Sequence, residues 1–82
     1  MTDEWLPAKQ VEEIMLKNDF VKIRRGDGCL HFKKMRRFSV VHIIFAKDGD
    51  KVQLKNAHYE AHFHRSISSQ RLLKQIGQLI QI

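Results

Sequence analysis

The sequence predicts a small α+β domain in which two helices flank three or four antiparallel strands. Apolar residues recur at helical spacing near both ends of the chain, and in the middle they alternate with polar residues between two glycine-containing turns. The chain has 82 residues, of which 43% are hydrophobic, so we expect one compact domain over residues 1–82. Both helices should pack on one face of the sheet and leave the opposite face open.

The first helix is expected over about residues 7–18. Pro7 suits the first turn of a helix, where no backbone N–H is needed. Val11, Ile14 and Met15 then follow at helical spacing, and Asn18-Asp19 marks the end.

Residues 21–24 and 30–33 both alternate in polarity, and Gly26-Asp27-Gly28 between them is typical of a hairpin turn. We therefore expect a hairpin with one basic face and one apolar face, the latter made of Val21, Ile23, Leu30 and Phe32.

Residues 38–46 are almost continuously apolar, which predicts a central strand covered on both sides, with Phe38 in the core. A second turn follows at residues 47–50. Residues 52–54 begin another strand, and residues 58–64 alternate as a last strand segment.

The closing helix is expected after a serine-rich stretch that offers N-caps at Ser66, Ser68 and Ser69. Gly77 lies within the periodic pattern and either costs about 1 kcal/mol relative to Ala or ends the helix early. The apolar positions of this helix have a 3.6-residue period: Leu72, Leu73, Ile76, Leu79 and Ile80.

The charge distribution favours a polyanionic partner. The net charge is +6, and between residues 22 and 37 only Asp27 is acidic. Clustered cations of this kind are typical of phosphate binders, so we expect an RNA or other nucleic-acid backbone to be bound; a solvated surface or an acidic protein partner would explain the same charge. The expected phosphate contacts are Lys22, Arg24, Arg25, Lys33, Lys34, Arg36 and Arg37.

Composition also restricts the setting. No apolar run approaches the ~18 residues of a membrane span, and the acidic N-terminus precedes no signal-type apolar region. The single cysteine, Cys29, excludes an internal disulfide. We expect a cytoplasmic protein that uses no cofactor and has no membrane partner.

Two segments carry a family resemblance. Val11–Phe32, VEEIMLKNDFVKIRRGDGCLHF, and Gln70–Gly77, QRLLKQIG, are similar to the opening helix and hairpin and to the closing helix of HicA toxins. Those toxins are small messenger-RNA interferases with a fold like the double-stranded-RNA-binding domain. The resemblance implies an RNA-facing surface and an antitoxin partner. The family's hairpin carries a catalytic His in Gly-Ser-His, whereas Gly28-Cys29-Leu30 occupies that place here, which implies an altered catalytic group.

Histidines supply the candidate chemistry. His31, one residue beyond the family's motif, is the candidate acid or base for RNA cleavage because imidazole titrates near neutral pH; an exposed strand histidine that contacts phosphate is the simpler interpretation. His58, His62 and His64 share one face of the predicted last strand, with His42 as a further candidate ligand. We expect no metal site from this spacing alone. A polar outer face that gains charge at low pH also explains it.

Three functions therefore remain open. The first is a HicA-like nucleic-acid-binding domain, which the charge distribution favours. The second is a protein-binding module of the phage or plasmid type that inhibits a host nucleic-acid-processing complex. The third is a ribonuclease dependent on His31.

Overall fold

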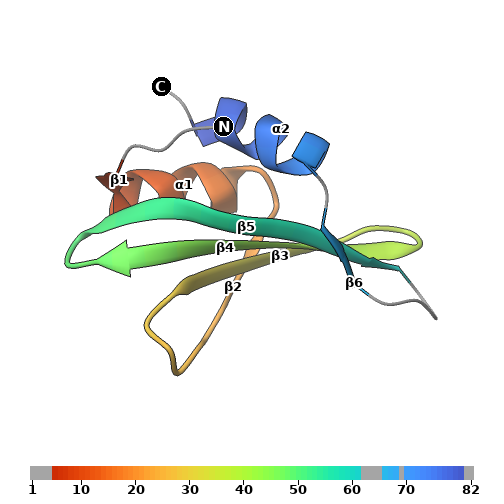
Figure 1. Ribbon diagram of the computed structural model, residues 1–82, viewed down its shortest axis with the longest axis horizontal. Coiled ribbons are helices and arrows are strands. Elements are labelled where there is room, and N and C mark those ends of the chain that lie inside the picture. Colours follow the sequence, from red (N-terminus) through yellow and green to blue (C-terminus); the bar gives the residue numbers. More distant parts are fainter. Residues whose placement is uncertain (1–4, 62–65, 69, 81–82) are drawn as a thin grey trace.

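The computed structural model describes residues 5–61, 66–68 and 70–80. Two helices accompany a curled antiparallel sheet whose strand order is β1-β5-β4-β3-β2, with β6 also pairing with β5 (Figure 1). The sequence prediction of an α+β domain with an antiparallel sheet is therefore confirmed. In chain order the elements are β1 Leu6–Pro7, α1 Ala8–Lys17, β2 Val21–Ile23, β3 Leu30–Met35, β4 Ser39–Asp48, β5 Lys51–Ala61, β6 Ser66–Ser68 and α2 Gln70–Ile80.

Helix α1 begins and ends where the local chemistry requires. Pro7 precedes the helix, and the N–H of Ala8 donates to the carbonyl of Asp50 at 2.8 Å. At the other end Asp19 adopts a left-handed φ of 70°, and the N–H of Phe20 reaches back to the carbonyl of Met15 at 3.0 Å. This is a Schellman-type ending, and it directs Phe20 into the core. The predicted stop at Asn18-Asp19 is confirmed.

The predicted face pattern of the first hairpin is wrong. Ile23 lies opposite His31 and Val21 opposite Lys33, so both apolar side chains share a face with polar ones. Lys22 lies opposite the buried Phe32 instead. The loop Arg24–Cys29 is longer than a two-residue turn and does not fix the register, and Lys22 gains an ion pair with Glu12 of α1 at 3.1 Å.

Strands β4 and β5 form a long hairpin closed by Gly49-Asp50 (Figure 1). Gly49 has a positive φ of 62°, whereas the φ of Asp50 is not positive. A positive φ at the first turn residue alone is the pattern of a type II′ turn. A bulge opposite Ile44 and Phe45 adds one residue to β5. The bulge shifts the alternation of β5, so Leu54 and Ala57 are both buried although three positions separate them. Residues 51–61 are thus one strand rather than two segments.

A single core joins both helices to β3, β4 and β5. Val11 and Met15 of α1 and Ile76 and Ile80 of α2 are buried in it, and the two helices contact each other and β5. The rings of Phe32 and Phe45 meet edge to face, 5.8 Å apart between centroids. The remaining buried apolar residues are Phe20, Leu30, Val41, Ile43, Val52, Leu54 and Ala57.

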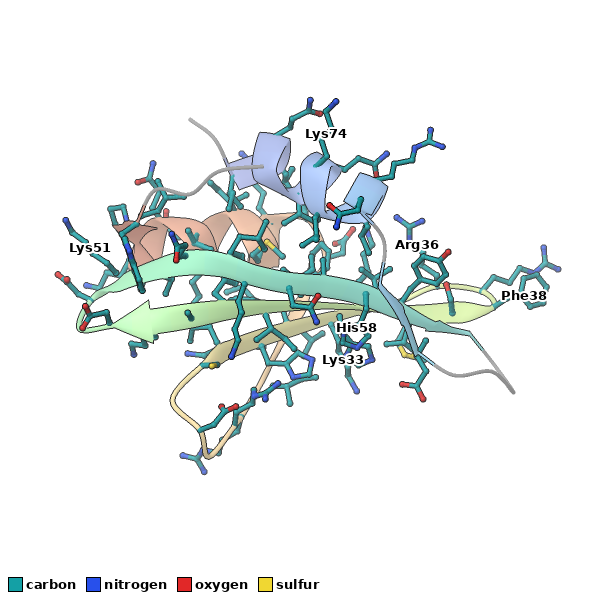
Figure 2. All side chains as sticks on the ribbon, in the orientation of Figure 1. Lys33, Arg36, Phe38, Lys51, His58 and Lys74 are labelled. Atoms are coloured by element: carbon teal, nitrogen blue, oxygen red, sulfur yellow. The ribbon has the colours of Figure 1, made fainter. Side chains whose placement is uncertain are left out.

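Three further expectations need correction. Strand β4 is buried on one side only, because Val40, His42 and Ile44 alternate with the core residues and stay partly exposed. Phe38 is 71% exposed at the tip of the β3–β4 hairpin, where the Arg37 guanidinium lies 5.4 Å from its ring centroid (Figure 2). Ser66 and Ser68, expected just before the closing helix, belong to strand β6, and Ser69 lies outside the described residues. Gly77 is buried within α2, so the helix does not end there.

Candidate nucleic-acid interface

Three histidines from adjacent strands meet on the outer face of the sheet, which we define as the side of β3, β4 and β5 opposite the buried core residues. His31, His42 and His58 alternate along their strands with core side chains, and the register sets Lys33, His42 and His58 in one row across the sheet. Figure 2 shows Lys33 and His58 on this side. We call His31, His42 and His58 the histidine cluster.

The rings of the histidine cluster are in direct contact. Nε2 of His31 lies 2.9 Å from Nδ1 of His42, which is a hydrogen-bond distance. The rings of His42 and His58 stack with centroids 4.9 Å apart and planes 20° apart. The other ring nitrogen of His42 lies 3.5 Å from a carboxylate oxygen of Glu60.

The surroundings favour neutral imidazoles at the two ends of the cluster. Partial burial, followed by the neighbouring His42, Arg25 and His58, lowers the pKa of His31, and Asp27 opposes the shift. Partial burial and His42 likewise lower the pKa of His58, against Glu60. One proton shared between His31 and His42 is compatible with their contact, whereas two protons would repel each other at 2.9 Å.

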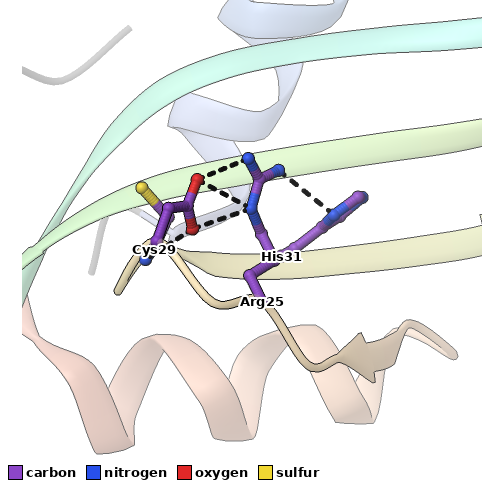
Figure 3. Close-up of polar contacts among 4 residues, drawn as sticks. Arg25, Cys29 and His31 are labelled. Carbon is purple, nitrogen blue, oxygen red and sulfur yellow. Dashed lines mark hydrogen bonds and ion pairs between the residues drawn. The ribbon is translucent and has the colours of Figure 1, made fainter.

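The loop between β2 and β3 is held by its own ion pair (Figure 3). The Arg25 guanidinium donates to both carboxylate oxygens of Asp27, at 2.6 Å and 3.0 Å, and the N–H of Cys29 donates to Asp27 at 3.2 Å. The guanidinium holds the pKa of Asp27 at about 2. Arg25 also lies 3.4 Å from Nδ1 of His31, so the loop and the histidine cluster are connected.

The seven cations predicted to contact phosphate do not form one basic face. Lys22 points to the helix side and pairs with Glu12, and the Lys34 ammonium lies 5.7 Å from the ring centroid of Phe20. Of the three predicted cations that lie in strands, Lys22, Lys33 and Lys34, Lys33 lies on the outer face. Figure 2 shows Arg36 on the same side of the sheet as α2. Arg24 and Arg37 are exposed in the two loops.

Basic side chains instead line two hollows. The Lys47 hollow, of about 400 Å³, lies beside the β2–β3 loop and is lined by Lys22, Ile23, Arg24, Arg25, Gly28, Cys29, Leu30 and Lys47. The Arg36 hollow, of about 360 Å³, lies between the β3–β4 turn, β5 and α2 and is lined by Arg36, Ser39, Val41, Tyr59, Arg71, Leu72 and Gln75. Neither lining contains a carboxylate.

Two of these lining cations were missed by the sequence analysis. Lys47 and Arg71 lie far from the charge-dense segment 22–37 and reach the hollows only through the sheet register and the packing of α2. The proximity of His42 to His31 was also missed, because it depends on the pairing of β3 with β4. Alternation along one strand cannot reveal a cluster that runs across strands.

The predicted histidine row of the last strand is only partly described. His58 lies in β5 beside His42, while His62 and His64 lie outside the described residues. Within residues 5–61, 66–68 and 70–80, no three His, Cys, Asp or Glu side chains are arranged to hold a metal ion.

Comparison with protein-family models, with curated proteins and with solved structures finds no significant match. No helix among the described residues has the length and apolarity needed to cross a bilayer. The function is therefore inferred from the residues of this chain and their arrangement.

Proposed function

We propose that this protein binds the sugar–phosphate backbone of a nucleic acid, with RNA as the expected strand. The observation that carries the proposal is the composition of the two hollows, which six cations and no carboxylates line. Backbone binding depends on such cations because each neutralised phosphate releases condensed counterions. The resemblance to HicA toxins fits the same partner.

We also infer that both helices cover one face of the sheet and leave the outer face open. Figure 1 draws α1 and α2 on the same side, and buried residues of both helices share one core with the strands. A strand lying across the outer face would meet Lys33 and the histidine cluster. The Lys47 hollow, lined by Lys22 and Leu30 from the core side of the sheet, would be a separate contact.

Salt dependence of binding tests the proposal. Fluorescence anisotropy of a labelled single-stranded RNA, and of DNA of the same sequence, is measured over a range of salt concentrations. We expect the logarithm of the affinity to fall linearly with the logarithm of salt, with a slope of about −0.7 for each phosphate contact. Replacing Arg24 and Lys47 with Gln removes two cations from the Lys47 hollow and should reduce the slope by about 1.4.

The matched control replaces Lys9 and Lys55 with Gln. Both are exposed and line neither hollow, so the same loss of charge should change the slope less. Equal effects of the two double variants would contradict a localised interface. No salt-dependent binding of either strand would overturn the proposal and favour a protein partner, for which the exposed Met35 and Phe38 offer apolar contacts.

RNA cleavage is the second candidate function, and the contact between His31 and His42 favours it. One neutral imidazole would take the proton of a 2′-hydroxyl as its oxygen bonds to phosphorus. The other imidazole, protonated at the start of the step, would donate its proton to the 5′-oxygen as the bond from phosphorus to that oxygen breaks, leaving a 2′,3′-cyclic phosphate and a 5′-hydroxyl. Arg25, 3.4 Å from His31, would offset the developing negative charge. Intact RNA after long incubation with the wild-type protein, or cleavage unchanged in His31→Ala, would exclude this role.

A further inference from the structure

The Arg36 hollow is built from three parts of the chain that lie far apart in the sequence. Arg36 follows β3 directly, Ser39 and Val41 begin β4, and Tyr59 lies near the end of β5. Arg71, Leu72 and Gln75 come from the first turns of α2. The N–H of Arg36 donates to the carbonyl of Ser39 at 2.7 Å, and this bond closes the β3–β4 turn that supports one side of the hollow.

Electrostatics distinguish this hollow from the Lys47 hollow. There Lys22 pairs with Glu12 and Arg25 pairs with Asp27, so two of the four cations are already compensated. Among the described residues neither Arg36 nor Arg71 has such a carboxylate partner. Glu60, the residue after Tyr59, contacts His42 on the outer face, and α2 has no acidic residue in its first turn. Two guanidinium groups with no carboxylate partner among the described residues therefore line one hollow.

The other lining groups suit more than a simple anion. The hydroxyls of Ser39 and Tyr59 and the amide of Gln75 donate and accept hydrogen bonds, as recognition of a sugar requires. The Tyr59 ring, Val41 and Leu72 add apolar surface on which a base can pack. A volume of about 360 Å³ exceeds the needs of one phosphate and is within the range of small-molecule sites.

We propose that the Arg36 hollow is a nucleotide subsite. In it Arg36 and Arg71 bind one phosphate, and the apolar surface around the Tyr59 ring packs against the attached nucleoside. The inference rests on the proposed function, because a bound strand would present this nucleotide. Guanidinium groups suit the task because their fixed donors match phosphate oxygens in pairs. The subsite would add recognition of one nucleotide unit to the salt-sensitive binding of the backbone.

Isothermal titration calorimetry with adenosine 5′-monophosphate, adenosine and inorganic phosphate tests the subsite. We expect the nucleotide to bind more tightly than either fragment. Arg36→Gln and Arg71→Gln should each weaken nucleotide binding by about tenfold, the loss expected for a charged hydrogen bond to phosphate. Lys74→Gln is the matched control, since Lys74 is exposed on the same helix but does not line the hollow, and it should bind like the wild type (Figure 2). Circular dichroism establishes that each variant is folded.

The outcomes separate the subsite from the proposed function. Absence of nucleotide binding, alongside salt-dependent oligonucleotide binding, would overturn the subsite and leave the proposed function intact. Equal affinity for inorganic phosphate and the nucleotide, or tighter binding of a phosphoserine peptide, would overturn the assignment to a nucleotide. Loss of nucleotide binding in the two arginine variants, with Lys74→Gln unaffected, would support it. Nucleotide binding without any oligonucleotide binding would support the subsite and overturn the backbone function.

Discussion

The histidine cluster concentrates titratable groups on the outer face of the sheet. His31 lies within hydrogen-bond distance of His42, and His58 stacks on His42. The cations near the three rings are Arg25 and Lys33, and the carboxylates are Asp27 and Glu60. Partial burial, followed by His42, Arg25 and His58, lowers the pKa of His31 despite Asp27. Partial burial and His42 lower the pKa of His58 despite Glu60. The folded state therefore prefers these two rings neutral.

This preference gives stability a defined pH dependence. The pKa values of His31 and His58 are lower in the folded chain than in the unfolded chain, so the unfolded chain takes up protons first as the pH falls through about 6.5. The free energy of unfolding should therefore decrease between about pH 7.5 and about pH 5.5. His42→Asn removes a ring that lowers the pKa of both His31 and His58, so it should make the decrease smaller. Thermal unfolding at several pH values measures this, and a melting temperature that rises on acidification would contradict it.

At the scale of the element, the turns decide whether local sequence predicts structure. The helix end at Asn18-Asp19 and the β4–β5 turn were predictable because each is encoded within a few residues. The β2–β3 hairpin was not, because its loop leaves the register free and the pairing of Lys22 with Glu12 depends on where α1 packs. The bulge in β5 was likewise not predictable, because it interrupts the polar–apolar alternation from which strands are predicted.

The β4–β5 turn gives a test at this scale. Gly49→Ala places a side chain at a φ of 62°, which should destabilise the protein by about 1–2 kcal/mol. Gly26→Ala is the control: it lies in a turn, has no positive φ, and its added methyl group meets nothing within 4 Å. Chemical denaturation of both variants measures the difference. Equal destabilisation would mean that the backbone conformation at Gly49 is not what the turn requires.

At the scale of the whole molecule, apolar burial and charge are arranged independently. The core is one cluster that the apolar pattern largely anticipated, whereas the cations are divided between two hollows and the outer face. Charge density along the chain could indicate a polyanionic partner. It could not indicate the site, because Arg36 and Arg71 become neighbours only when α2 packs beside β5.

The stability effects of truncating a buried and an exposed phenylalanine, Phe32 and Phe38, test where the core ends. Phe32 is fully buried and contacts Phe45, so Phe32→Ala should cost about 3–5 kcal/mol of unfolding free energy. Phe38 is 71% exposed, so Phe38→Ala should change stability by about 0.5 kcal/mol or less. Urea denaturation of both variants provides the measurement. A large loss for Phe38→Ala would show that the hairpin tip is packed rather than exposed.

Strand β5 pairs with β1 near its beginning and with β6 near its end, along the edge opposite β4. The β4–β5 pairing is local in sequence, whereas the β1–β5 pairing joins residues far apart in the chain. Because closing a shorter loop costs less entropy, we expect β4 and β5 to pair in the transition state and β1 to pair with β5 afterwards. Leu6→Ala should then speed unfolding and leave the folding rate nearly unchanged, whereas Val41→Ala should slow folding. Stopped-flow chevron plots distinguish the two. The pairing of β1 with β5 would thus be the last to form and the first to be lost. It would therefore help to set the unfolding rate, and with it the lifetime of the native state.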